Sequence, residues 1–144
     1  MLSLDAKGRL AIPARHREEL ASASDGQLVL TVHQHRCLLL YPLHAWEPIR
    51  DKLNARATLN VREAVYQQRN MVGMAKENLA LDSSGRLLIP PELRQFAQIE
   101  KLLWLVGLGS HFEIWSDAGW QRQQNIFLEM GDQPLPPGLE DLVL

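Results

Sequence analysis

The sequence contains a single cysteine, Cys37, among 144 residues, so an internal disulfide framework is excluded. No apolar run approaches the roughly 18–20 residues that a membrane helix needs. The N-terminus shows no charged segment followed by an apolar stretch, so no signal peptide is visible. Together these absences indicate a soluble protein of a reducing compartment.

Motifs of common enzymes are also missing. The sequence has no G-x-S-x-G elbow, no phosphate-binding P-loop, no dinucleotide fingerprint and no C-x-x-C pair. His33, His35 and Cys37 are metal-ligand types at alternating positions, but residues 34–36 are expected to form a hairpin turn that breaks their alignment. The sequence therefore favours a protein that is not an enzyme and that holds no metal or other cofactor.

Basic residues are few overall but unevenly placed. The net charge is -2, which by itself disfavours nucleic-acid binding. Residues 1–17 nevertheless carry four basic side chains against one acidic, and residues 50–69 carry five against two. The last sixteen residues hold four acidic side chains and no lysine or arginine. The chain is thus polarised, with basic segments and an acidic tail.

The sequence contains an internal repeat. LSLDAKGRLAIP at residues 2–13 and LALDSSGRLLIP at residues 79–90 are identical at eight of twelve positions. Arg17 and Arg94 keep the same offset of 77, and a second pair of similar blocks ends at Trp46 and Trp120, with an offset of 74. Two matched blocks in the same order indicate a tandem duplication.

Hydrophobic alternation and turn residues predict the same elements in both copies. Strands are expected near residues 2–4, 9–12, 27–32 and 37–41, and again at 76–81, 86–89, 102–107 and 111–115. Helices are expected at 14–22, 43–55, 60–75, 91–98 and 116–129, with Val61, Val65, Met71 and Met74 as the apolar positions of the third. The expected divisions are repeat 1 at 1–49, connecting helices at 50–75, repeat 2 at 76–122, and a helix end with an acidic, proline-rich tail at 123–144.

The tryptophans could form a surface on which nucleic-acid bases stack. Trp46 and Trp120, however, occupy the same place in the two copies of the repeat. This match favours a shared contact between a helix and the core.

The D-x-x-G-R turn is the most informative motif, because it occurs twice. Asp5 and Asp82 are expected to organise the turns by accepting backbone N–H groups, and Gly8 and Gly85 to supply positive φ angles. Arg9 suits phosphate or guanine recognition, since its planar fork donates parallel hydrogen bonds. An ion pair with aspartate that only fixes the turn is an equally good interpretation, and both roles can coexist.

These motifs carry a resemblance. LDAKGRLAIPARHR, LDSSGRLLIPPELR and LLLYPLHAWE resemble the MraZ family over essentially the whole chain. The family is a tandem-repeat branch of the AbrB-like swapped-hairpin DNA-binding proteins. The resemblance implies an α+β fold with two tandem swapped-hairpin AbrB-like β-barrel halves and connecting and C-terminal helices. The chain starts four residues before Asp5, whereas the resemblance implies a longer first strand.

The resemblance also implies a function. A bacterial transcriptional regulator is expected, associated with the nucleoid in the cytoplasm and assembled as a ring-shaped homo-oligomer. It would bind direct repeats in double-stranded DNA upstream of the division and cell-wall gene cluster. The implied DNA-binding residues are Lys7, Arg9, Arg15, Arg17, Arg86 and Arg94.

The second copy has Ser84 and Glu92 where the first has Lys7 and Arg15, so it is the less basic of the two. A protein-interaction or antitoxin-like module is the alternative function, and the acidic tail could serve it.

Overall fold

The computed structural model describes residues 1–131, 134 and 136–139. The first repeat forms β1 (Leu2–Ser3), β2 (Arg9–Ala11), α1 (Ala14–Ser22), the short 3₁₀ helix η1 (Ala23–Gly26), β3 (Leu28–His33), β4 (Cys37–Pro42) and α2 (Leu43–Ala57). It is followed by α3 (Arg62–Gln67) and the π-helix η2 (Gln68–Val72). The second repeat forms β5 (Lys76–Leu79), β6 (Arg86–Leu88), α4 (Pro91–Phe96), β7 (Leu102–Gly107), β8 (Phe112–Ser116) and α5 (Asp117–Met130).

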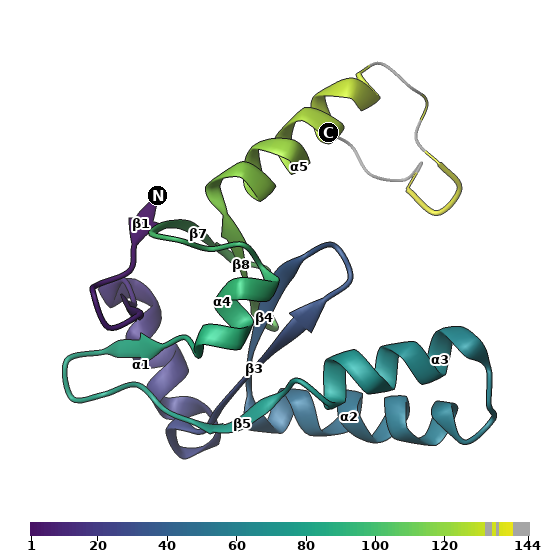
Figure 1. Cartoon of the computed structure of the whole chain (residues 1–144), viewed down its shortest axis with the longest axis horizontal. Coiled ribbons are helices and arrows are strands. Elements are labelled where there is room, and N and C mark those ends of the chain that lie inside the picture. The colour runs from purple at the N-terminus through teal and green to yellow at the C-terminus, as the bar shows by residue number, and fades with distance from the viewer. Residues whose placement is uncertain (132–133, 135, 140–144) are drawn as a thin grey trace.

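The two repeats exchange strands. One antiparallel sheet has the order β1-β7-β8-β4-β3-β5, and β2 pairs with β6 in a separate two-stranded ribbon (Figure 1). The first strand of each repeat therefore pairs with the other repeat, β1 with β7 and β5 with β3. Each repeat forms one hairpin of its own, β3 with β4 and β7 with β8, and the remaining strand pairs join the two repeats.

The pairing register shows that an approximate two-fold axis relates the repeats. Leu10 of β2 lies opposite Leu87 of β6, its equivalent at the offset of 77. Leu39 of β4 lies opposite Glu113 of β8, its equivalent at the offset of 74. A residue that pairs with its own counterpart in an antiparallel ladder lies on such an axis, so the internal repeat is also an internal symmetry.

The sheet is open, with β1 and β5 at its edges, so the predicted pair of barrel halves is not confirmed. A mixed α and β fold with an antiparallel sheet is what the structure has. Short strands leave each repeat with too little core of its own, and the two repeats share one core instead. The proposed divisions at residues 49, 75 and 122 stay a prediction.

The predicted helix over residues 60–75 is shorter and changes type. It begins at Arg62 and becomes a π-helix at Gln68. Val61, expected among the apolar positions within this helix, instead precedes it as the N-cap residue at the end of the α2–α3 hairpin and is 49% exposed. The predicted tail from Gly131 lies largely outside the described residues.

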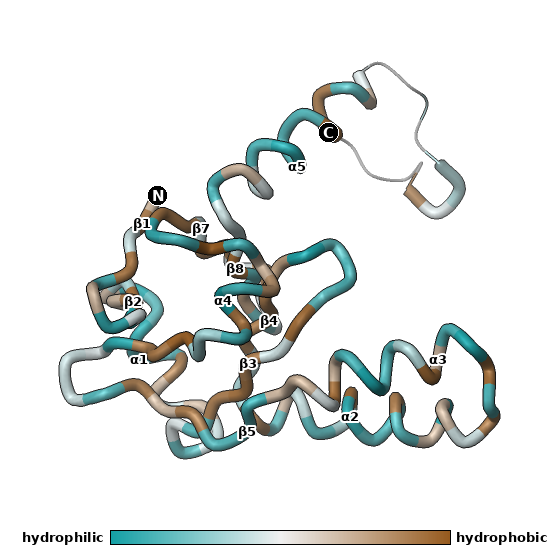
Figure 2. The backbone as a smooth tube through the Cα atoms, viewed as in Figure 1, coloured by the Kyte–Doolittle hydropathy of each residue, from teal (hydrophilic) through white to brown (hydrophobic). Residues whose placement is uncertain are grey.

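Two apolar clusters hold the fold together. The larger contains side chains of both repeats, including Leu10 and Leu87, which are fully buried. The smaller surrounds Trp46 on the other face and includes the half-buried Trp120, so the predicted core role of these tryptophans is confirmed. Figure 2 shows the hydrophobic residues along β3 and β4 and, away from the sheet, at the end of α5. Among the described residues, no helix is long and apolar enough to cross a membrane.

Candidate nucleic-acid interface

The first D-x-x-G-R turn is closed by a set of hydrogen bonds to Asp5. Its Oδ1 accepts the backbone N–H groups of Lys7 and Arg9, both at 2.9 Å. Its Oδ2 accepts the Arg9 Nε–H at 2.7 Å. The backbone N–H of Gly8 donates to the Asp5 carbonyl at 3.0 Å, and Gly8 has φ +81°. The turn therefore holds Arg9 at a fixed angle at the start of β2.

The second turn repeats this geometry. Asp82 Oδ1 accepts from the N–H groups of Ser84 and Arg86 at 2.9 Å, and Oδ2 accepts the Arg86 Nε–H at 2.9 Å. Gly85 has φ +74°. The turn-organising roles predicted for the aspartates and glycines are confirmed, and so is the Asp–Arg ion pair in both copies. A DNA contact by either arginine stays a prediction.

Each turn is also packed against an arginine of the other repeat. A Cβ added to Gly8 would lie 2.8 Å from Cζ of Arg94, and one added to Gly85 would lie 2.6 Å from Cδ of Arg17. The Arg17 Nε–H donates to the Ile12 carbonyl at 2.8 Å. Arg17 and Arg94 were predicted to contact phosphate, and that role stays untested; the structure gives both a second role, as the packing partners of the opposite turn.

The ribbon of β2 and β6 brings the two motif copies together. In its register Arg9 lies opposite Leu88 and Ala11 opposite Arg86. Directly opposite residues share a face, so both arginines point to the side away from the buried Leu10. Arg86 Nη1 also approaches Asp5 Oδ2 at 4.0 Å, across the two repeats. The sequence indicated two separate motifs, and the pairing of β2 with β6 places their arginines on the same outer face.

The other predicted DNA-binding residues of the first copy are exposed near this face. Lys7 lies in the turn itself. Arg15 is exposed on the first turn of α1, where its Nε–H donates to the His16 ring at 3.1 Å. Residues between the arginines, such as the half-exposed Leu88, were not singled out from the sequence. The repeat offset of 77 and the alternating pattern of β6 could have indicated that such residues share a face with the arginines.

The turn hydrogen bonds change the acidity of both aspartates. The Arg9 backbone N–H, followed by the Arg9 side chain and the Lys7 N–H, lowers the pKa of Asp5 despite a desolvation effect in the opposite direction. The Arg86 backbone N–H, with the Ser84 N–H and the Arg86 side chain, lowers the pKa of Asp82 in the same way. Both carboxylates therefore favour the charged form in the folded protein.

We expect these turns to be lost on acidification. A lowered pKa in the folded state contributes stability that is present above the unfolded pKa, about 3.9 for aspartate, and is lost as the pH falls through the folded value. Thermal melts of the wild type should therefore show a melting temperature that falls steeply below about pH 4. The double variant Asp5→Asn and Asp82→Asn should be less stable near pH 7 and show a flatter profile; equal slopes would contradict this explanation.

His33, His35 and Cys37 belong to the β3–β4 hairpin and not to the β2–β6 ribbon. The His33 and His35 rings are 4.7 Å apart, whereas the Cys37 side chain is fully buried. Burial, reinforced by the charge of Glu113, raises the pKa of the Cys37 thiol to about 12, so it stays protonated at neutral pH. Within the described part of the chain, no three His, Cys, Asp or Glu side chains gather closely enough to hold a metal ion.

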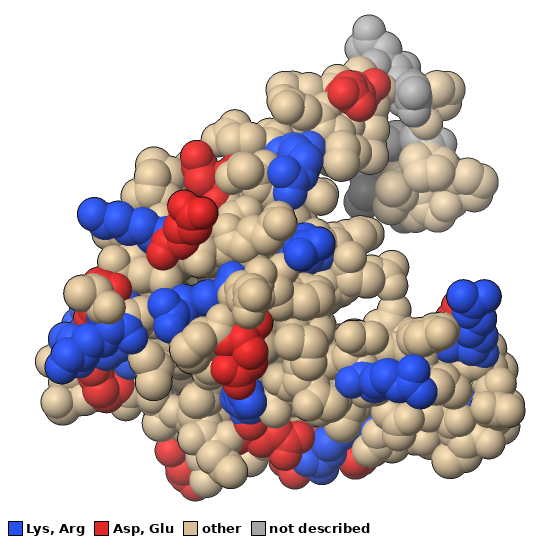
Figure 3. Space-filling model, viewed as in Figure 1, with Lys and Arg blue, Asp and Glu red and all other residues tan. Residues whose placement is uncertain are grey.

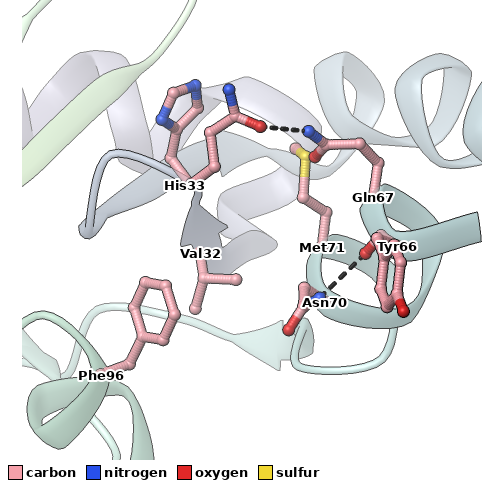
Figure 4. A pocket seen from close by; sticks show the side chains of 8 residues that line it. Val32, His33, Tyr66, Gln67, Asn70, Met71 and Phe96 are labelled. Carbon is pink, nitrogen blue, oxygen red and sulfur yellow. Dashed lines mark hydrogen bonds between the residues drawn. The ribbon is translucent and has the colours of Figure 1, made fainter. Parts of the chain in front are cut away.

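A separate pocket of about 260 Å³ lies between the β3–β4 hairpin and the helices α3 and η2. Figure 4 shows Val32, Met71 and Phe96 around it, with Tyr66 on one side and the Gln67 amide bonded to Gln34. Its residues come from elements other than the ribbon, so it is not part of the candidate interface.

Comparison with known proteins gives the relationship of the whole chain. The profile of the family described as "MraZ protein, putative antitoxin-like" matches residues 1–69 and again residues 72–133. The chain belongs to the MraZ family. Each match contains one D-x-x-G-R turn, so the two MraZ units correspond to the two copies of the repeat.

Individual MraZ relatives align along almost the full length. The chain is 57% identical over 143 residues to "Transcriptional regulator MraZ" of Dechloromonas aromatica (strain RCB), covering 99% of this chain and 95% of that protein. It is 56% identical over 143 residues to the protein of that name from Azoarcus sp. (strain BH72), with the same shares covered. The MraZ relatives are thus named as regulators of transcription, a name that describes no class of enzyme, and they support a regulatory role for this chain.

Proposed function

We propose that this MraZ chain regulates transcription by binding double-stranded DNA through the outer face of the β2–β6 ribbon. The observation that supports this most is the placement of Arg9 and Arg86 on one face by strands of two different repeats. A two-stranded antiparallel ribbon fits the major groove of B-DNA, where arginine recognises guanine through O6 and N7.

The ion pairs in the turns are compatible with this role. Asp5 and Asp82 hold the arginines through Nε, at 2.7 and 2.9 Å. Among the described residues, the terminal Nη groups of Arg9 have no hydrogen-bond partner, so they remain available to an acceptor outside the chain. Holding Nε also lowers the entropy that the side chain loses on binding. Lys7, Arg15, Arg17 and Arg94 are proposed as supporting phosphate contacts.

The finer proposal follows from the family resemblance. The DNA sites are short direct repeats upstream of the division and cell-wall gene cluster, and the chain acts as a ring-shaped homo-oligomer associated with the nucleoid in the cytoplasm. The aspartates neutralise much of each motif's positive charge, so a single copy binds weakly. A ring presents the same face several times along one duplex, and linked weak contacts raise the avidity.

Fluorescence anisotropy tests this proposal. The wild type is titrated against a duplex that carries direct repeats and against a scrambled duplex, across a series of salt concentrations. We expect repeat-selective binding that weakens steeply with salt, because many phosphates are neutralised at once. Arg9→Ala should weaken binding at least about tenfold, since a bidentate base contact contributes about 1–3 kcal/mol.

A matched control shows whether a loss of DNA binding comes from the position of Arg9 or only from the removal of one positive charge. Lys52→Ala removes one positive charge from an exposed site on α2, away from the ribbon, and should leave selectivity unchanged. Lys7→Ala should reduce the salt slope by about one, as expected for a lost phosphate contact. Equal binding of the wild type to both duplexes, or equal losses in Arg9→Ala and Lys52→Ala, would overturn the proposal.

A protein-interaction module is the second candidate, favoured by the words "antitoxin-like" in the family description. Charge reversal at Arg9 distinguishes the two. A DNA-binding regulator loses DNA binding in this variant and keeps its assembly state, whereas a module without strong DNA binding shows little affinity for DNA even before the change.

A further inference from the structure

The outer face of the β2–β6 ribbon carries an exposed leucine, Leu88, between its two arginines. In the ribbon register Leu88 lies directly opposite Arg9, and Ala11 lies directly opposite Arg86. Leu88 is 50% exposed, whereas the preceding Leu87 points to the inner face and is fully buried. The outer face therefore has the two arginines on one diagonal and the two apolar side chains on the other.

The two ends of this face differ, although the repeats are related by an approximate two-fold axis. Leu88 is the counterpart of Ala11 at the offset of 77, so a large apolar side chain is present at one end and a single methyl group at the other. The Ile89 N–H donates to the Gly8 carbonyl at 3.0 Å, which places Leu88 beside the first turn. That turn also carries Lys7. The same end of the ribbon is thus both the more basic and the more apolar.

Charge gives this face little power to distinguish one DNA sequence from another. An aspartate pairs with the arginine in each turn. Basic and acidic side chains accordingly lie side by side at the left edge of Figure 3, where Figure 1 shows the two turns. Contacts to phosphate fix the position of a protein on the duplex but carry no sequence information. Sequence selectivity therefore depends on the side chains that meet base edges, which are the arginines and Leu88.

The position of Leu88, more than its exposure, indicates what it contacts. A single exposed leucine is ordinary on a protein surface. A ribbon that enters the major groove, however, presses Leu88 against base edges. Most of these edges present hydrogen-bond donors and acceptors, which would lose water beside a leucine without gaining a new partner. The methyl group of thymine is the apolar group in this groove, and its burial against Leu88 is favourable.

The geometry of the ribbon limits where this thymine lies. Side chains directly opposite each other in an antiparallel pair have Cβ atoms about 4.5–5.5 Å apart. Successive base pairs of B-DNA are roughly 3.4 Å apart along the helix axis. A base that contacts Leu88 therefore lies within about two base pairs of the guanine bound by Arg9.

We propose that Leu88 determines sequence specificity by contacting the methyl group of a thymine close to the guanine bound by Arg9. Because the opposite end has Ala11 at this place, the ribbon prefers one direction along the DNA site. The inference rests on the proposed DNA binding by the ribbon. Its test removes only the methyl group of thymine, so it can fail while binding through the arginines stands.

Deoxyuridine in place of thymine provides this test, since it lacks the methyl group and keeps every hydrogen-bonding group. Fluorescence anisotropy compares the direct-repeat duplex containing thymine with the same duplex containing deoxyuridine throughout. We expect the wild type to bind the deoxyuridine duplex at least about fourfold more weakly, the factor equivalent to about 0.8 kcal/mol for one buried methyl group. Leu88→Ala should bind the thymine duplex more weakly than the wild type and should not distinguish the two duplexes.

Two further variants control for truncation and for position. Leu108→Ala makes the same change at a 51% exposed leucine of the β7–β8 hairpin and should keep the wild-type preference for thymine. The double variant Ala11→Leu and Leu88→Ala moves the leucine to the place opposite Arg86. With deoxyuridine introduced at one position at a time, this exchange variant should again depend on a thymine methyl group, at a different position from the wild type.

The possible outcomes separate this inference from the proposed function. Equal binding of the wild type to both duplexes overturns the inference, and leaves the proposed function standing where binding is repeat-selective and lost in Arg9→Ala. The inference is also overturned if Leu88→Ala still prefers thymine, if Leu108→Ala loses the preference equally, or if the exchange variant shows none. A wild type that binds neither duplex overturns the proposed function and this inference together.

Discussion

Replacing Gly85 by alanine is expected to lower the free energy of unfolding by about 3 kcal/mol, from two effects. Gly85 has φ +74°, and an L-residue in this region costs about 1–2 kcal/mol. The new Cβ would also displace Arg17, whose Cδ would lie 2.6 Å away. Moving Arg17 endangers its hydrogen bond to the Ile12 carbonyl, and a bond of this charged type contributes about 1.5–3 kcal/mol.

Gly109→Ala separates these two effects in a urea denaturation series. Gly109 has φ +85° but no atom within 4 Å of an added Cβ, so only the backbone effect of about 1–2 kcal/mol should remain. In an Arg17→Ala background, the further loss caused by Gly85→Ala should shrink to that of Gly109→Ala. Equal losses in the two single variants would show that packing between Arg17 and the turn contributes nothing.

This packing matters for function because it couples the repeats. Arg94 packs on the turn of Gly8 and Arg17 on the turn of Gly85, so the turns before Arg9 and Arg86 are each supported by a helix of the other repeat. The proposed recognition face is therefore a property of the pair of repeats. A Gly85→Ala variant should bind DNA less well than its remaining folded fraction explains.

Local features of the fold could be predicted from the sequence. Alternation and turn residues placed most strands and helices within a few residues, since Pro13, Pro42 and Pro90 mark element boundaries directly. The D-x-x-G-R turn was equally accessible, because its hydrogen bonds join residues at most four apart. Such contacts depend on short stretches of chain.

Pairings over long sequence separations could not be predicted in the same way. The exchange of β1 and β5 between repeats and the pairing of Leu10 with Leu87 depend on the common core of both copies. The arginine contacts of Gly8 and Gly85 were missed for the same reason. The charge of Arg17 suggested a phosphate contact, which stays a prediction, but nothing in the sequence indicated that Arg17 also packs against Gly85.

Replacing Trp46 by alanine is expected to lower the free energy of unfolding by about 3–5 kcal/mol, the largest loss at any position considered. Trp46 is fully buried, so its removal leaves a cavity between α2 and the sheet. Its Nε1–H also donates to Glu77 Oε1 at 2.7 Å, linking α2 to β5 of the other repeat. Domains of this size are stable by only about 5–15 kcal/mol, so the variant should be close to unfolding.

Two further variants show how much of the lost stability comes from the hydrogen bond of Trp46 and how much from its burial. Trp46→Phe keeps most of the volume but removes the hydrogen bond; Arg50 still holds Glu77 at 3.2 Å, so the loss should be about 1–2 kcal/mol. Trp120→Ala removes the repeat counterpart, which is only half-buried, and should destabilise less than Trp46→Ala. A loss for Trp120→Ala as large as that for Trp46→Ala would contradict the assignment of the difference to burial.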